Sequence, residues 1–151
     1  RQILTIASVL ALAYVMNFSG QTIAMGTFLA GLGTVYAFLA PALGWIGTAV
    51  TGSDTSANAL FAKLQVSAAE NLQHAGIHGA TPELMLAANT TGGVVGKMIS
   101  PQSLAIAATS VDMEGKESDI LKAVLPWSFA MLLFVCVLVF LQTNVLSFMI
   151  P

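Results

Sequence analysis

One stretch of the chain, AANTTGGVVGKMISPQSLAIA (Ala87–Ala107), carries the residue types that bind phosphate: glycines, a lysine and hydroxyl side chains. A phosphate-binding loop follows the pattern G-x-x-x-x-G-K-[ST]. With Gly96 and Lys97 in register, the first glycine position holds Thr91, and the residue after the lysine is Met98 instead of Ser or Thr. No strand pattern precedes the stretch. Two defining positions fail, so the sequence argues against a nucleotide site.

The composition indicates a membrane protein. Hydrophobic residues make up 56% of the 151 positions and charged residues only 8%, whereas a soluble domain carries about 25% charged residues. A small globule must present polar groups over most of its surface, so the missing charge indicates that much of this surface faces lipid. The net charge of −2 and the lack of a basic run give no sign of nucleic-acid binding.

Long uncharged runs predict an all-α fold. They also predict that the chain is a fragment of a polytopic integral membrane protein. A spanning helix needs about 17–25 apolar residues, and three runs approach or exceed that length. Pro41 is expected to end the second run. The predicted elements are helices over 3–18, 22–40 and 123–150, a re-entrant hairpin over 41–66 and an interrupted helix over 84–111. Because the chain starts without Met and enters apolar sequence at once, we expect it to be a piece of a longer membrane protein.

The hairpin is predicted from short apolar arms around a polar tip. The first arm, Ala42–Val50, is only about half a bilayer long, and the polar cluster Thr51–Asn58 follows it before helical character returns. Irregular backbone at membrane depth is tolerated only where it is buried in protein or lines a cavity. We therefore expect Thr51–Asn58 to form the tip of a re-entrant hairpin.

The segment Leu84–Val111 is long enough to cross a membrane, but its middle is interrupted. The interrupting residues are Gly92, Gly93, Gly96 and Pro101. A continuous helix would cost roughly 1 kcal/mol for each glycine and about 3 kcal/mol for the proline. We expect two half-helices separated by an unwound joint.

Two broken segments of this kind are typical of secondary transporters, in which half-helix N-termini point at anionic groups of the substrate near the bilayer midplane. Free backbone N–H groups, hydroxyls and amides at the breaks can bind a carboxylate. The candidate substrate-binding residues are Ser53, Thr55, Ser56, Asn58, Asn89, Thr90, Thr91, Gly92, Gly93, Lys97, Ser100, Gln102 and Ser103. The alternative is that these groups only cap the half-helices and satisfy one another, because capping and binding use the same atoms.

Two ionisable residues lie at the predicted breaks. An ammonium near the bilayer centre costs at least about 2.5–3.5 kcal/mol, so Lys97 is expected to face an anionic substrate or to pair with Asp54. Its alternatives are to extend to the membrane interface or to hold the unwound backbone. Asp54 is the candidate proton-coupling residue, since a desolvated carboxylate beside a lysine can bind and release a proton. Its alternative role is to cap the returning arm of the hairpin.

His74 and His78 have the spacing of two metal ligands on one helical face. Gly76 and Gly79 argue against a helix there, and no third ligand is evident unless Glu70 serves. We expect a solvated loop over Asn71–Glu83 and no metal site. No histidine lies near a serine in the sequence, so there is no support for catalytic residues, and no cofactor is expected.

Two long motifs carry a family resemblance: GWIGTAVTGSDTSANALFAKLQ (Gly44–Gln65) and LMLAANTTGGVVGKMISPQSLAIA (Leu84–Ala107). In this order and spacing they closely resemble the bacterial L-lactate permease family. The resemblance implies a multi-pass carrier of the bacterial cytoplasmic (inner) membrane that takes up L-lactate, D-lactate or glycolate together with protons. It also implies kinship with carriers built from inverted repeats with re-entrant hairpins. Family members are much longer, so the chain corresponds to about the C-terminal quarter of one.

The sequence therefore predicts part of a secondary active transporter, not an enzyme. The expected partners are a small monocarboxylate, protons, membrane lipid and the remainder of the polypeptide upstream, with no nucleic acid. The alternatives are a symporter for another small organic anion, with sodium as the coupling ion, a passive anion channel, and a structural membrane subunit of an enzyme complex.

Overall fold

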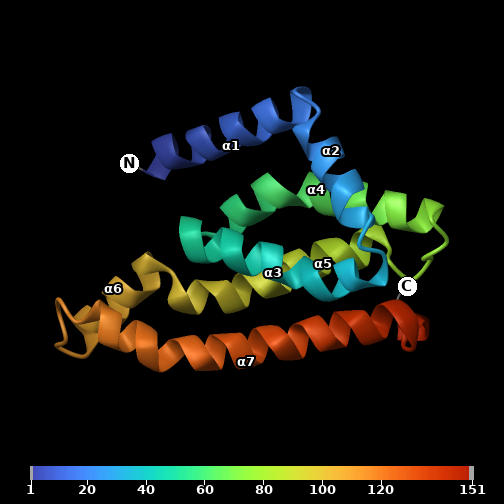
Figure 1. Cartoon of the computed structure of the whole chain (residues 1–151). Coiled ribbons are helices and arrows are strands. Elements are labelled where there is room, and N and C mark those ends of the chain that lie inside the picture. The colour runs from blue at the N-terminus through green and yellow to red at the C-terminus, as the bar shows by residue number, and fades with distance from the viewer. Residues whose placement is uncertain (1, 150–151) are drawn as a thin grey trace.

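The computed structural model describes residues 2–149, and all the regular secondary structure in this part of the chain is helical (Figure 1). The α-helices are α1 (Gln2–Phe18), α2 (Gln21–Ala30), α3 (Thr34–Thr51), α4 (Asp54–His74), α5 (Pro82–Gly96), α6 (Pro101–Ser110) and α7 (Glu117–Asn144). Two short 3-10 helices, η1 (Lys97–Ile99) and η2 (Ser147–Met149), follow α5 and α7. The predicted all-α class is confirmed.

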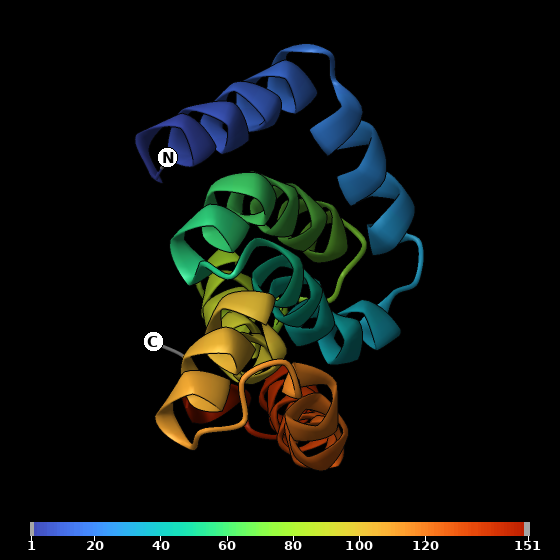
Figure 2. The same ribbon diagram turned by 90° about the vertical axis from the view of Figure 1, so that its left-hand side faces the viewer.

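The helices form successive layers (Figures 1 and 2). Helices α3, α4 and α5 pack on one another in the centre, α1 and α2 lie against the outer side of α4, and α7 runs along α3 and α5 on the opposite side. The buried core lies where α3, α4, α5 and α7 meet, and much of it is alanine. Small side chains allow the helix axes to approach closely, as is common in membrane helix bundles.

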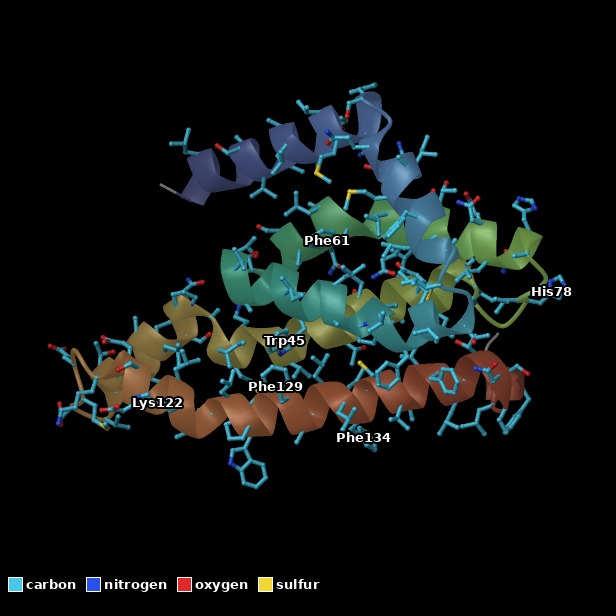
Figure 3. All side chains as sticks on the ribbon, viewed as in Figure 1. Trp45, Phe61, His78, Lys122, Phe129 and Phe134 are labelled. Carbon is cyan, nitrogen blue, oxygen red and sulfur yellow. The ribbon has the colours of Figure 1, made fainter. Side chains whose placement is uncertain are left out.

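Two helices are long and apolar enough to cross a membrane: α3 and α7. The α1–α2 pair, bent by 72° at Ser19–Gly20, would count as a third if it forms one broken span. The outer side of α7 exposes large apolar side chains, among them Trp127 at 70% and Phe134 at 69%. Figure 3 shows Phe134 pointing away from the other helices. An apolar surface of this extent suits contact with lipid.

Helix α7 is attached to the centre through a tryptophan. Trp45 on α3 packs against Phe129 with ring centroids 5.0 Å apart (Figure 3). Its indole Nε1 donates a hydrogen bond of 2.9 Å to Ser128 Oγ, which in turn donates to the carbonyl of Val95 on α5. Ser128 is completely buried. This contact satisfies the indole N–H and links three helices.

The helix predicted over 22–40 is divided in the structure, and this prediction was wrong. The chain leaves α2 at Ala30 and starts α3 at Thr34. Gly33 has φ 61° and ψ −138°, a backbone conformation that is essentially restricted to glycine. Pro41, expected to end a helix, lies inside α3 instead. Membrane helices tolerate an internal proline because neighbouring groups satisfy the freed backbone.

The two arms of the hairpin are α3 and α4, which are longer than the predicted 41–66, and the tip is shorter than predicted. Only Gly52 and Ser53 lie between the helices. Gly52 ends α3 in the left-handed conformation (φ 73°), as is common at helix C-termini. Ser53 caps α4 by accepting a hydrogen bond from Ser56 N at 3.3 Å. Residues 54–58 are therefore the first turns of a helix, not irregular backbone.

Helix α4 also extends beyond the expected arm. It continues to His74, so the first residues of the predicted loop Asn71–Glu83 are helical. The loop itself is short, and the next helix starts at Pro82 with Thr81 as its N-cap. Proline is favoured at the first position of a helix because its missing N–H would have no partner there.

The glycines of the interrupted segment do not unwind it. Gly92, Gly93 and Gly96 all lie inside α5, where the prediction placed a joint. A Cβ on Gly92 would collide with the Pro41 carbonyl of α3, and one on Gly96 with the carbonyl of Trp45. The glycines thus let the two backbones touch, and this packing offsets their low helix propensity.

The interruption lies further along, at Lys97–Ser100. Helix α5 passes into η1, Ser100 then takes an extended conformation (φ −68°, ψ 143°), and Pro101 begins α6. A residue before proline is driven out of the helical region by the proline ring. Ser100 also caps α6 by accepting a hydrogen bond from Ser103 N at 3.3 Å. The proline, not the glycines, causes the break.

The last helix begins and ends about six residues earlier than the predicted 123–150, at Glu117 and Asn144. Its first turn carries Glu117 and Asp119, which interact favourably with the positive end of the helix dipole. The end of the predicted range, residue 150, lies outside the described residues.

Replacing Gly92 by alanine is expected to destabilise the fold. The added Cβ would meet the backbone of Pro41, which cannot rotate away as a side chain would. We expect a loss of about 1–3 kcal/mol in the free energy of unfolding, measured by thermal unfolding in detergent. Ala87→Leu is the matched control, because it adds side-chain atoms at an exposed position of the same helix. Equal melting temperatures would contradict the close approach of α3 and α5.

Replacing Ser100 by alanine is expected to weaken the start of α6. The buried hydroxyl accepts from Ser103 N and donates to the Lys97 carbonyl at 3.0 Å. Loss of such a cap costs about 1 kcal/mol, which hydrogen exchange of the α6 amides and thermal unfolding would both detect. Ser110→Ala, at the exposed end of the same helix, should change neither. A Ser100 variant that behaves like the control would show that the cap contributes nothing.

Candidate functional site

The structure brings the two breaks of the chain together. A Cβ on Gly52, in the hairpin tip, would lie 3.1 Å from Gln102 Oε1 at the start of α6. Gly93 of α5 lies directly over Asp54, at the start of α4. The segments Thr51–Asn58 and Asn89–Ser103, far apart in the sequence, are therefore neighbours in space.

A cavity of about 250 Å³ lies on the other side of the hairpin tip, between α1 and the start of α4. Its lining residues are Val9, Leu10, Ser53, Thr55, Ser56 and Ala59. Three predicted binding residues, Ser53, Thr55 and Ser56, are among them. No candidate residue of α5 or α6 lines this cavity. Binding sites for drug-sized ligands occupy about 300–1,000 Å³, so this cavity suits a molecule of a few carbon atoms.

The electrostatics at this end of the cavity favour an anion. Asp54 and Thr55 occupy the first positions of α4, where backbone N–H groups have no partner within the helix. These groups give the helix N-terminus a partial positive charge. Hydroxyl groups of Thr55 and Ser56 lie beside it, while Val9 and Leu10 make the opposite wall apolar. The cavity thus has one polar, positive end and one apolar side.

The carboxylate of Asp54 has two different environments. Its Oδ2 accepts a hydrogen bond of 3.3 Å from Asn58 Nδ2, one turn along α4. Its Oδ1 is buried and, within residues 2–149, has no hydrogen-bond partner. The hydroxyl of Thr48, a fully buried residue near the end of α3, likewise has no hydrogen-bond partner within residues 2–149. Both oxygens lie over Gly93, where a Cβ would collide with Asp54 Oδ1 and come within 2.8 Å of Thr48 Oγ1.

A chain of polar side chains, half-buried at its start and fully buried further along, leads from Asp54 into the centre of the bundle. It links α4, α5 and α3, and its members in order are Asp54, Asn58, Asn89, Gln65 and Tyr36. The Asn89 Nδ2 to Asn58 Oδ1 bond is 2.8 Å and the Gln65 Nε2 to Asn89 Oδ1 bond is 3.2 Å. Asn89, Gln65 and Tyr36 are completely buried.

Two members of this chain, Tyr36 and Gln65, were missed in the sequence. Spacing gives a signal for Gln65: Asp54, Asn58 and Gln65 are four and seven residues apart, which places them on one face of a helix. No comparable pattern marks Tyr36, because its role depends on a partner in another helix.

Lys97 does not pair with Asp54. Its side chain is exposed, and the one ion pair within residues 2–149 joins Lys122 and Asp119 at 3.6 Å on the exposed start of α7. The expectation of a Lys97–Asp54 ion pair is therefore wrong for this structure. The lysine follows α5 directly as its C-cap residue, a position where a positive charge interacts favourably with the helix dipole.

Several predicted binding residues on α5 and α6 have structural partners instead. Thr91 is exposed and donates to the Ala87 carbonyl of its own helix. Gly92 and Gly93 lie within α5, so their N–H groups are not the free donors that an unwound joint would supply. Ser100 and Ser103 bind each other at the start of α6.

The histidines lie at the end of the molecule away from the hairpin tip. His74 ends α4 and His78 lies in the following loop, both exposed (Figure 3). Among residues 2–149, no three His, Cys, Asp or Glu side chains are grouped closely enough to hold a metal ion.

The sequence matches known transport proteins over nearly its whole length. The L-lactate permease family profile matches residues 1–146. The L-lactate permease of Bacillus subtilis (strain 168) is 50% identical over 149 residues, which cover 99% of this chain and 25% of that protein. The L-lactate permease of Escherichia coli (strain K12) is 47% identical over 149 residues, or 99% of this chain and 26% of the relative. The glycolate permease GlcA of the same strain is 41% identical over 148 residues, covering 98% and 25%.

The chain spans about a quarter of the length of the curated relatives it matches. No solved structure matches it. The family match covers nearly the whole chain, and among the described residues two apolar helices are long enough to cross a bilayer, as in a multi-pass protein of the bacterial cytoplasmic membrane. On these grounds the chain belongs to the L-lactate permease family.

Proposed function

We propose that the protein takes part in uptake of L-lactate and related 2-hydroxy-monocarboxylates, D-lactate and glycolate, by proton symport. The observation that carries the proposal is the placement of Asp54. Its chain neighbours Ser53 and Thr55 line the cavity, while its own buried Oδ1 lies with the Thr48 hydroxyl over Gly93. The printed names of the relatives, L-lactate and glycolate permeases, supply the substrate class.

In this proposal the substrate carboxylate lies at the start of α4. Free N–H groups of the first turn and the hydroxyls of Ser53, Thr55 and Ser56 would hold the carboxylate and the 2-hydroxyl group. The small apolar part of the substrate would contact Val9 and Leu10 across the cavity. A lactate methyl group and the smaller glycolate both fit such a wall, so this face would tolerate either.

Coupling of substrate binding to proton binding follows because the substrate carboxylate and the Asp54 carboxyl group lie at the same helix N-terminus. When the substrate anion is bound, an ionised Asp54 nearby repels it, and a proton on Asp54 removes the repulsion. Binding of the anion and binding of the proton therefore favour each other, and this linkage is reciprocal. A proton on Oδ1 would also donate to the unpartnered Thr48 oxygen.

The remaining candidate residues act around this centre in the proposal. Hydrogen bonds hold the Asp54 side of the site in place. Asn89 Nδ2 and Thr90 Oγ1 both donate to Asn58 Oδ1, the latter at 3.1 Å. Lys97, exposed at the end of α5, would add positive potential near the site. Gln102 lies against Gly52 of the hairpin tip and Gly93 lies over Asp54, while Ser100 and Ser103 bind each other at the start of α6.

The substitution Asp54→Asn tests the coupling role. An amide cannot exchange the proton, so we expect a permease of full family length carrying the variant to lose lactate accumulation driven by a pH gradient. Exchange of labelled for unlabelled lactate should continue, because the substrate groups are intact. The measurement is uptake into proteoliposomes. Asp119→Asn, on the exposed start of α7, is the control.

Three outcomes of that experiment oppose the proposal. Gradient-driven accumulation that survives Asp54→Asn removes Asp54 from coupling. Wild-type uptake that follows a sodium gradient and ignores the pH gradient identifies a sodium symporter. Lactate flux that never exceeds equilibrium, with or without an uncoupler, identifies a passive channel.

Filling the cavity tests the substrate site. Ala59→Phe adds a ring to the lining, and we expect KM for lactate to rise at least tenfold, or uptake to disappear, while the protein remains folded. The control is Ala105→Phe on an exposed position of α6, which should leave KM within about twofold. Unchanged kinetics in the Ala59 variant would place the substrate elsewhere. Competition by lactate, glycolate, pyruvate and citrate would define the range of accepted anions.

A further inference from the structure

The proposed substrate site uses the Asp54 end of the polar chain, but Gln65 and Tyr36 lie beyond that site, buried in the centre of the bundle. The polar chain crosses from α3 through α4 and α5 and back to Asp54 on α4. Buried amides are costly unless their hydrogen bonds are made. A chain of this length therefore calls for a role beyond filling space.

The chain has a fixed direction. Gln65 Nε2 donates to the backbone carbonyl of Ala40 at 3.0 Å. A carbonyl oxygen can only accept, so the amide nitrogen of Gln65 must face it and Oε1 must face the hydroxyl of Tyr36. A reversed amide would set oxygen against oxygen at Ala40.

This direction passes from one amide to the next. Because Gln65 Nε2 also donates to Asn89, the oxygen of Asn89 faces Gln65 and its nitrogen faces Asn58. Asn58 then receives a donor on its oxygen, which leaves its Nδ2 to donate to Asp54 Oδ2 at 3.3 Å. One backbone carbonyl on α3 thus determines that the last group of the chain presents a donor to the carboxylate.

We propose that Gln65 and Asn89 are positioning residues for Asp54. Their oriented amides keep a donor on Oδ2 and so hold Oδ1 as the free oxygen, facing Thr48 over Gly93. This inference rests on the proposed role of Asp54 as the coupling carboxylate. The last hydrogen bond of the amide chain, from Asn58 to Asp54 Oδ2, is stronger when Asp54 is ionised, because hydrogen bonds to a charged group are stronger. The amide chain therefore favours the ionised form of Asp54.

Few charged groups compete with this effect. Lys97, at the end of α5, is the charged side chain that acts on Asp54. Helix α3 contributes the uncharged Thr48, and the sequences of α1, α3 and α6 contain no Asp, Glu, Lys, Arg or His. On α4 the nearest charged residue along the chain is Lys63, which is exposed. Besides the charge of Lys97 and the hydroxyl of Thr48, the amide chain is an influence on the carboxylate that substitution can change.

The test is the pH profile of lactate uptake by a permease of full family length. Asn89→Asp keeps the acceptor for Gln65 but, when ionised, offers no donor to Asn58, so the Asn58 amide is expected to reverse. The carboxylate of Asp54 then loses its donor and holds its proton to a higher pH. We expect the upper limb of the profile to move upward by about one to two pH units, with Asn144→Asp, an exposed Asn on α7, showing no shift.

A charge-free variant separates the chain from an added carboxylate. Gln65→Met removes the amide that fixes the direction, and we expect a shift of the same sign but smaller size. If that variant is not recovered folded, Asn89→Leu removes the same contact from the α5 side. Tyr36→Phe should leave the profile within a few tenths of a pH unit, because Ala40 still orients Gln65.

The outcomes distinguish this inference from the proposed function. If Asp54→Asn abolishes coupling but the charge-free variants lower only the maximal rate, the chain has a structural role and the inference fails while the proposed function stands. A shift in Asn89→Asp alone would reflect added charge and also overturn it. If Asp54→Asn leaves coupling intact, both fall together.

Discussion

The close approach of α3 and α5 is the constraint on which the rest of the structure depends. Lipid is as apolar as a leucine side chain, so membrane helices associate through close packing and interhelical hydrogen bonds more than through the hydrophobic effect. Here glycines on both helices allow backbone to touch backbone, with Gly44 against the Asn89 carbonyl and Gly92 against that of Pro41. At this separation one side chain, Gln65 on α4, can reach both the Ala40 carbonyl of α3 and Asn89 of α5. A wider spacing would leave those buried amides without partners.

The same constraint explains the stretch that resembles a phosphate loop. Its glycines do not surround a ligand with backbone N–H groups. They form the surface of α5 that faces α3 and the hairpin tip, and Gly93 leaves the space that the carboxylate of Asp54 occupies. Lys97 comes directly after the last residue of α5, shortly before the break that Pro101 causes. Its positive charge suits the end of that helix. Glycines and a lysine thus occur together for reasons of helix packing and helix termination.

Much of the architecture could be predicted from the sequence, and the failures have a common cause. The long uncharged runs predict a helical membrane protein. Pro101 and the serine before it predict a break in the helix. The α5 glycines were assigned to an unwound joint because helix propensity is measured without a packed neighbour, and a contact with another backbone reverses that preference. Residues 54–58 were assigned to a loop because hydroxyls and carboxylates favour turns and N-caps alike. Tyr36 could not be found, because nothing along the chain near it reveals its partner 29 residues away.

In the proposed symport mechanism, the hairpin tip separates the substrate site from the proton site. On the α1 side the start of α4 offers free N–H groups and hydroxyls to an anion. On the α5 side a carboxylate of the same helical turn has one oxygen held by the amide chain and one oxygen without a partner. An unsatisfied buried polar atom costs about 1–3 kcal/mol, and the Thr48 hydroxyl, over the same glycine, is a group that can donate to Oδ1. In the proposed mechanism a proton on Asp54 removes its negative charge and thereby favours binding of the substrate anion at the same helix N-terminus.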